Sequence, residues 1–156
     1  MAKQQQGLRI PVAKKANETE TLEFSFKHLD IQSKKFDIAS CTAEYFRSLL
    51  IAVQKYSGYT VDRFRDQNKQ TDRHTIDFSE TSEPNGFSSL DDNLNMEEPW
   101  QIRICPEEKK EPEIGWRASG ILIGNIFYMV WLDPRHKLYP DHHPNHTAPK
   151  NPKKKK

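Results

Sequence analysis

Five ionisable or aromatic side chains lie within seven residues near the C-terminal end of the chain. They are Asp133, Arg135, His136, Lys137 and Tyr139. A histidine can transfer protons near neutral pH, a tyrosine can stack on a base or donate a proton, and arginine with lysine can hold a phosphate. These residue types suit metal-independent cleavage of RNA. The structural alternative is that Asp133 and Pro134 make a turn and Tyr139 closes the core.

A second histidine, His74, follows Arg73 in a weakly patterned segment. It would pair with His136 as an acid and a base if both segments reach the same edge of a sheet. An isolated surface histidine beside an arginine is the structural alternative. Arg63 and Arg65, on a predicted helix, would add phosphate contacts, although exposed helical arginines are often only solvated.

Further histidines follow in the C-terminal segment, at His142, His143 and His146. Imidazole is a frequent metal ligand, but the intervening Pro, Asn and Asp residues supply no groups that would orient a ligand set. We therefore predict no metal and no cofactor. Gly-rich phosphate loops, GxSxG and HExxH are also absent, which disfavours nucleotide hydrolysis, serine hydrolases and zinc proteases.

The elements that position these side chains must come from the central part of the chain. Of 156 residues, 35% are hydrophobic and 29% charged, whereas both ends are polar. We predict one domain over residues 19–140, between disordered tails at residues 1–18 and 141–156. The net charge of +2 includes the lysines at 150 and 153–156, so the central part is slightly acidic. This disfavours a nucleic-acid binder that uses its whole surface.

The cysteines and the apolar segments indicate a location. Cys41 and Cys105 show no metal spacing, which favours a reduced intracellular chain. The longest apolar run, residues 121–132, is interrupted by Gly-Asn and is too short to span a bilayer. The sequence thus predicts a cytoplasmic protein with no membrane partner. It leaves the oligomeric state open.

Hydrophobic periodicity predicts the order of the elements. A strand is expected at residues 21–27, a long helix at 40–56 with Ser40 as its N-cap, and a short helix at 61–67 capped by Thr60. A weak strand at 74–78 and a long loop at 79–99 follow, then strands at 100–105, 116–123 and 126–132. Gly124-Asn125 suits the tight turn between the last two. The predicted fold class is α+β, a twisted antiparallel sheet of four to five strands with one long and one short helix packed on one face.

Both strands of the last hairpin are apolar on two faces. Simple alternation places Phe127, Met129 and Trp131 together on one face of the second strand. Such a face is either covered by the rest of the chain or exposed as a surface for a partner protein. The exposure of these three side chains distinguishes the two cases.

The order of a strand, two helices and several antiparallel strands that end in a basic and aromatic edge resembles the RelE/ParE superfamily of small bacterial toxins. Members with RNase activity cut messenger RNA on the ribosome. The resemblance covers residues 21–139, and the chain is longer than a typical member, with an extra region at 66–99. It implies site positions on two strands and at the last edge: Arg103, Arg117, Arg135, His136, Lys137 and Tyr139.

The leading expectation is an RNA-binding protein with metal-independent endoribonuclease activity of the toxin type. Its catalytic residues would be His136, Tyr139 and His74. Its substrate-binding residues would be Arg135, Lys137, Arg117, Arg103, Arg63 and Arg65. The expected partner is RNA or the ribosome, together with a protein such as an antitoxin. The alternative is a non-catalytic protein-binding accessory factor of a phage, mobile element or defence system. Lost cleavage with retained folding in His136→Ala would favour catalysis.

Overall fold

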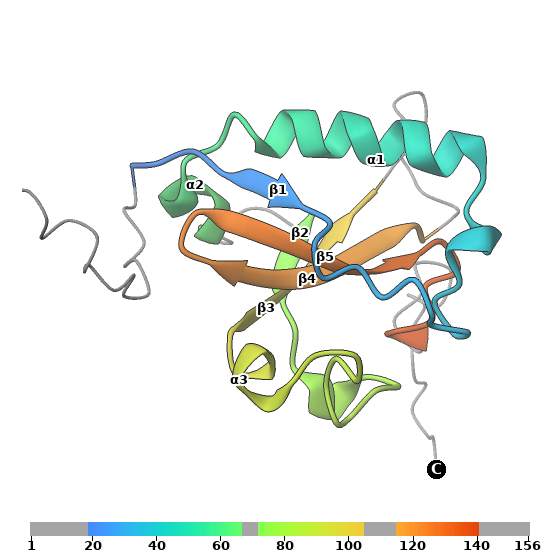
Figure 1. The fold of residues 1–156 in the computed structure, drawn as a ribbon. Coiled ribbons are helices and arrows are strands. Elements are labelled where there is room, and N and C mark those ends of the chain that lie inside the picture. Colours follow the sequence, from blue (N-terminus) through green and yellow to red (C-terminus); the bar gives the residue numbers. More distant parts are fainter. Residues whose placement is uncertain (1–18, 67–71, 105–114, 141–156) are drawn as a thin grey trace, which may run out of the picture.

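The computed structural model describes residues 19–66, 72–104 and 115–140 (Figure 1). Within these ranges, five strands form one sheet in the order β1-β5-β4-β3-β2. They are β1 (Glu23–Ser25), β2 (Arg73–Thr75), β3 (Glu98–Arg103), β4 (Arg117–Ile123) and β5 (Ile126–Asp133). The helices are η2 (Ile38–Ser40), α1 (Ala43–Tyr56), α2 (Val61–Arg65), η3 (Phe78–Glu80) and α3 (Asp92–Asn95). The predicted α+β class is confirmed, and the predicted tails lie outside the described residues.

The sheet is mixed, which corrects the antiparallel prediction at one edge. β1 pairs in parallel with β5, so that Glu23 lies opposite Ile126 and Ser25 opposite Tyr128. The pairs β5–β4, β4–β3 and β3–β2 are antiparallel. Alternation in the sequence indicates that a segment is a strand, but it does not fix the direction of a partner far along the chain.

Helices α1 and α2 pack on the same face of the sheet, as predicted; we call it the α1 face (Figure 1). Helix α1 begins three residues later than predicted because Thr42, rather than Ser40, is its N-cap, with the Thr42 hydroxyl accepting from Tyr45 N at 3.0 Å. Ser40 instead ends the 3-10 turn η2 and donates to the Asp37 carbonyl. Thr60 caps α2 as predicted.

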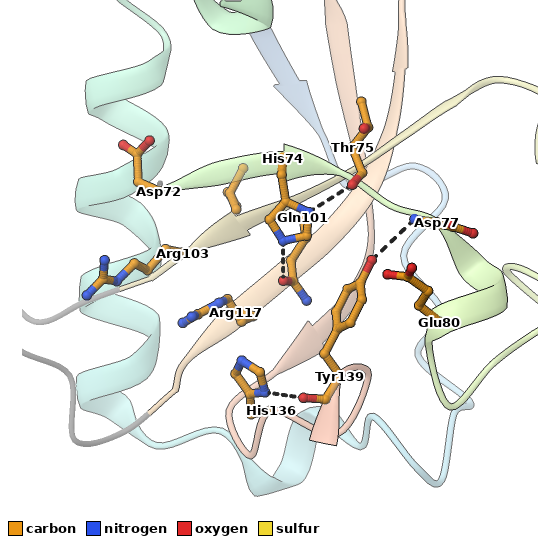
Figure 2. A pocket seen from close by; sticks show the side chains of 11 residues that line it. Asp72, His74, Thr75, Asp77, Glu80, Gln101, Arg103, Arg117, His136 and Tyr139 are labelled. Carbon is orange, nitrogen blue, oxygen red and sulfur yellow. Dashed lines mark hydrogen bonds between the residues drawn. The ribbon is translucent and has the colours of Figure 1, made fainter. Parts of the chain in front are cut away.

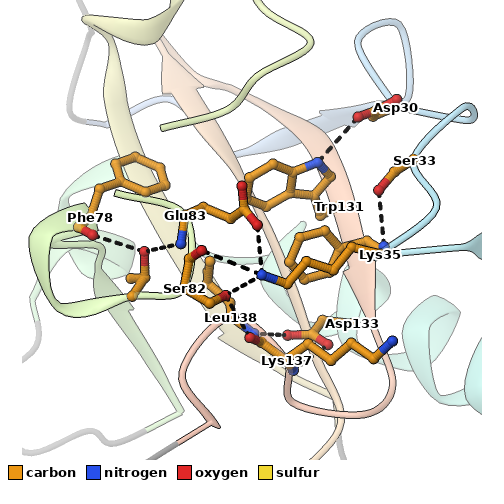
Figure 3. A network of polar contacts seen from close by, with 12 residues as sticks. Asp30, Ser33, Lys35, Phe78, Ser82, Glu83, Trp131, Asp133, Lys137 and Leu138 are labelled. Atoms are coloured by element: carbon orange, nitrogen blue, oxygen red, sulfur yellow. Dashed lines mark hydrogen bonds and ion pairs between the residues drawn. The ribbon is translucent and has the colours of Figure 1, made fainter. Parts of the chain in front are cut away.

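The opposite face, which we call the loop face, is covered by chain segments rather than by a long helix (Figure 1). Trp131 stacks on Phe36 with ring centroids 4.4 Å apart and packs against Phe87 at 4.7 Å. The predicted loop at 79–99 thus contributes a layer of the core and contains α3. Lys35 ties three segments together: its Nζ pairs with Glu83 at 2.6 Å and donates to Ser82 Oγ, which donates to the Lys137 carbonyl (Figure 3).

The hairpin is confirmed, with Gly124 in the turn at φ 64°, but the predicted alternation along β5 is wrong from Trp131 onward. Ser119 pairs with Trp131 while Gly120 pairs with Met129, so one extra residue bulges from β5. Trp131 therefore lies on the loop face, opposite to Phe127 and Met129.

The three hairpin side chains that would mark a partner surface are covered by the chain itself. Phe127 and Met129 are 0% exposed and Trp131 is 2% exposed. This hairpin surface therefore offers no apolar site for a partner protein. Within the described ranges, no helix has the length and apolar character that crossing a membrane requires.

Candidate functional site

A pocket of about 300 Å³ opens on the loop face beside the edge strand β2 (Figure 2). Strands β2, β3 and β4, the segment around η3 and the turn after β5 all contribute to its wall. The lining residues are Asp72, His74, Thr75, Asp77, Glu80, Gln101, Ile102, Arg103, Arg117, His136 and Tyr139. The sheet thus brings together segments that are more than sixty residues apart.

Five of the predicted site residues line this one pocket: His74, Arg103, Arg117, His136 and Tyr139. The two histidines therefore line one pocket, although His74 is on the edge strand β2 and His136 follows β5, which lies next to the opposite edge of the sheet. The rings of His74 and Tyr139 meet edge to face with centroids 5.5 Å apart. Whether these residues are functional stays a prediction, but their convergence on one pocket is a feature of the fold.

Strand register explains why the pocket carries several polar side chains on one face. His74 lies opposite Gln101, and Arg103 lies opposite Arg117. Directly opposed residues point to the same side of a sheet, and residues two apart along a strand do the same. Because Ile102 and Ala118 belong to the core of the α1 face, their neighbours point toward the loop face.

His136 is held in an unusual backbone conformation by a buried carboxylate. Asp133 is 1% exposed and accepts from the backbone nitrogens of Lys137 at 2.7 Å and Leu138 at 2.9 Å. This turn gives His136 a φ of 57°, in the left-handed region that side chains other than glycine seldom adopt. His136 Nδ1 lies 2.9 Å from the Tyr139 carbonyl, and the side chain is buried. Strained conformations of this kind are concentrated at functional sites.

Removing the Asp133 carboxylate should destabilise this turn. Asp133→Ala leaves two buried N–H groups without an acceptor, so we expect the free energy of unfolding to fall by about 2 kcal/mol. Asp133→Asn keeps one acceptor oxygen and should lose less. Urea unfolding of each variant measures the effect, with the exposed N-cap variant Asp37→Ala as the control. An Asp133→Ala loss no greater than that of Asp37→Ala would contradict this role.

Burial raises the pKa of Asp133, although the N–H groups of Lys137 and Leu138 and the nearby charge of Arg117 oppose the shift. The folded state therefore keeps the Asp133 proton at a higher pH than the unfolded chain does. It follows that protonated Asp133 favours folding at low pH, and this contribution is lost as the pH rises through the raised pKa. Asp133→Ala should lack this pH dependence.

Tyr139 closes the pocket on the side of η3. Its hydroxyl accepts from the Asp77 backbone nitrogen at 3.2 Å. Burial raises the pKa of Tyr139, the Asp77 N–H opposes this shift, and the carboxylates of Glu80 and Asp77 add to it. The phenol therefore keeps its proton at neutral pH and offers the pocket a neutral donor.

Both ring nitrogens of His74 face oxygen atoms. Nδ1 lies 2.8 Å from the Thr75 carbonyl, and Nε2 lies 3.1 Å from Gln101 Oε1. Gln101 is 2% exposed, and its Nε2 has no hydrogen-bond partner among the described residues. No sequence pattern distinguishes Gln101 from an ordinary polar residue of an alternating strand, so it was not predicted. Its place two residues before Arg103 was the one available signal.

The two arginines give the pocket a cationic end. Like charges directly opposite on neighbouring strands repel each other. The Nε of Arg103 is also buried without a hydrogen-bond partner in the described part of the chain. The nearby Asp72 already contacts Lys55 and Arg73. Burial opposes the ionisation of Asp72, but hydrogen bonds from Tyr56 and Lys55 and the positive charges of Lys55 and Arg73 outweigh it, so the pKa of Asp72 lies below the usual range.

Four predicted substrate-binding residues do not line the pocket. Arg135 is exposed on the turn, and Lys137 contributes its backbone rather than its side chain to the contacts around Asp133. Arg63 lies over the Tyr59 ring at 3.8 Å, and Arg65 forms a salt bridge to Glu98 at 2.8 Å. Arg63 and Arg65 are on α2, next to a separate hollow.

No group of three or more His, Cys, Asp or Glu residues within the described ranges could hold a metal ion. The histidines at 142, 143 and 146 lie outside those ranges. No protein-family model matches the chain, and neither the curated proteins nor the solved structures include a match. The resemblance to the RelE/ParE superfamily therefore stays a prediction.

Proposed function

We propose that the pocket binds a phosphodiester group of RNA and cleaves it by acid–base catalysis without a metal ion. The observation that carries the proposal is the convergence of two histidines with two opposed arginines in one pocket. Histidines supply an acid and a base near neutral pH, and arginines bind phosphate oxygens. The buried Nε of Arg103, which has no partner among the described residues, supports an acceptor-rich ligand at this end.

The hydrogen bonds suggest a different role for each histidine. A carbonyl oxygen only accepts, so the contact with Tyr139 places the His136 proton on Nδ1 and leaves the lone pair of the neutral ring on Nε2. His136 is thus suited to the base. His74 faces two oxygens and is suited to the protonated acid.

The proposed reaction requires no co-reactant. His136 Nε2 takes the proton of a ribose 2′-hydroxyl, and the 2′-oxygen attacks the adjacent phosphorus. The bond from phosphorus to the 5′-oxygen breaks, and His74 supplies the proton to that oxygen. The products are a 2′,3′-cyclic phosphate and a 5′-hydroxyl end. Arg103 and Arg117 would stabilise the charge that develops on the phosphate oxygens.

The test is to incubate the full-length chain with end-labelled RNA and, separately, with ribosomes translating a defined message. Half of the reactions contain EDTA. We expect EDTA-insensitive cuts that leave 2′,3′-cyclic phosphate ends. Matched RNA in which a 2′-deoxyribose replaces the ribose at the cut site should resist cleavage. Absence of cleavage on both substrates, or cleavage abolished by EDTA, would overturn the proposed reaction.

Neutralising the arginines should weaken RNA binding. We expect Arg103→Gln and Arg117→Gln each to reduce affinity about tenfold, because each removes a charge-assisted contact to phosphate. Fluorescence anisotropy with labelled RNA at fixed salt measures the change. Arg47→Gln, on the exposed side of α1, removes the same charge far from the loop face. An equal loss in Arg47→Gln would show that only the net charge matters.

A further inference from the structure

Gln101 occupies the centre of the polar row that crosses the sheet. Its side chain is 2% exposed and lines the pocket, with Oε1 facing His74 Nε2 at 3.1 Å. Figure 2 shows the His74 ring between Thr75 and Gln101. The amide nitrogen of Gln101 is buried without a hydrogen-bond partner in the described part of the chain. An unsatisfied buried donor of this kind is costly unless a ligand accepts from it.

The contacts of His74 determine which way the Gln101 amide faces. Nδ1 lies 2.8 Å from the Thr75 carbonyl, which only accepts, so Nδ1 must carry a proton. A neutral ring then has no proton on Nε2, whereas the imidazolium has protons on both nitrogens. An amide whose oxygen faces Nε2 therefore fits protonated His74, which donates from both ring nitrogens. The NH₂ group of Gln101 is then left to the pocket.

A neutral His74 requires the opposite arrangement. Its Nε2 would accept rather than donate, so the amide must turn over and present NH₂ to the ring and Oε1 to the pocket. Ser119, directly opposite Gln101 on β4, has a buried hydroxyl with no partner among the described residues. A hydroxyl can donate or accept, so Ser119 is compatible with either orientation.

We propose that Gln101 is a specificity-determining residue whose orientation follows the protonation of His74. With His74 protonated, Gln101 offers N–H donors and the pocket accepts an anion; with His74 neutral, it offers an oxygen and repels one. Binding of an anion is therefore coupled to the uptake of one proton. The inference rests on the proposed phosphate site and adds the residue that makes its selectivity depend on pH.

The other charged or titratable groups that share the pocket with His74 come from every element around it. They are Asp72, Asp77, Glu80, Arg103, Arg117, His136 and Tyr139. Of these, His136 is the other histidine. A test must therefore separate the two histidines.

The first arm of the test needs no ligand. In the isotope-labelled full-length chain, NMR follows the Gln101 side-chain amide and the His74 ring between about pH 5 and pH 8.5. The Gln101 signals are assigned by their loss in Gln101→Met. We expect both groups to titrate with one midpoint. The Gln101 titration should persist in His136→Asn and vanish in His74→Phe. Gln101 amide chemical shifts that do not change with pH, or that still change with pH in His74→Phe, would overturn the inference.

The second arm uses sulfate, which stays a dianion throughout this range. We expect sulfate to bind the wild type about tenfold more tightly near pH 5.5 than near pH 8, and Gln101→Met to lose about tenfold at the lower pH. Equal affinity of wild type and Gln101→Met would overturn the role of Gln101 while the anion site stands. If sulfate fails to bind although Gln101 titrates with His74, the anion site fails and the coupling of the two residues stands.

Discussion

Gly120→Ala is expected to lower the free energy of unfolding by about 4 kcal/mol, the largest loss that we predict for any single substitution. A Cβ at position 120 would lie 2.0 Å from the Tyr128 carbonyl oxygen and 2.8 Å from a ring carbon of Phe127. The first contact is with backbone, so it cannot be relieved by a side-chain rotation. The hairpin at the centre of the sheet would have to separate or shift.

Urea unfolding, followed by tryptophan fluorescence, measures this loss from the shift in the transition midpoint. Gly58→Ala is the matched control because its Cβ would meet only the Lys55 carbonyl oxygen, at 3.5 Å, an ordinary contact. We expect this variant to change stability by less than about 1 kcal/mol. Similar midpoints for the two variants would show that β4 and β5 tolerate the extra carbon and that their close approach is not a constraint.

His136→Asn should reduce the rate of RNA cleavage by about 100- to 10,000-fold, the range that general acid–base groups contribute, while the protein stays folded. Asn tolerates the left-handed conformation that His136 adopts at φ 57°. Its amide nitrogen could also donate to the Tyr139 carbonyl in place of Nδ1. The substitution thus keeps the turn and removes the group that can accept a proton.

His136→Asn is a cleaner test of catalysis than His136→Ala, because alanine tolerates positive φ poorly and has no side-chain donor for the Tyr139 carbonyl. Cleavage rates at saturating RNA, compared with thermal unfolding of the same samples, separate catalysis from folding. His28→Asn is the control, since His28 packs on Tyr128 with centroids 5.0 Å apart and does not line the pocket. A His136→Asn enzyme that cuts within threefold of the wild-type rate would exclude His136 as the base.

The sequence was sufficient for those elements whose periodicity is long and unbroken. The helical spacing of six apolar residues predicts α1: Tyr45, Phe46, Leu49, Leu50, Val53 and Tyr56. Tyr45, Leu49 and Tyr56 are buried against the sheet, whereas Phe46 and Leu50 are exposed. The two runs around Gly124 predict the hairpin. The direction of β1 could not be predicted, because its pairing with β5 depends on how the intervening chain crosses the sheet. The bulge in β5 could not be predicted either, because a prediction from alternation assumes an unbroken strand register.

The candidate site was also predictable only in part. The residue types at the end of β5 indicated His136 and Tyr139, and the weak strand indicated His74, all of which line the pocket. Arg135 and Lys137 could not be separated from them by sequence, because the turn that excludes their side chains depends on the buried Asp133 carboxylate. The structural alternative for this segment also finds support, since Asp133 orders a turn and Tyr139 is buried in the core.

The strand order sets the timing of folding during synthesis. β1, made early, lies beside β5, which is the last strand to be made among the described residues, so Glu23 has no pairing partner until Ile126 has been synthesised. The hydrophobic core on the α1 face also includes Phe127 and Met129 of β5. Contacts so distant along the chain make folding slow, and the early segments expose apolar surface meanwhile. A nascent chain that ends before β5 therefore lacks the strand that joins β1 to β4, and the sheet is completed only when the hairpin has left the ribosome.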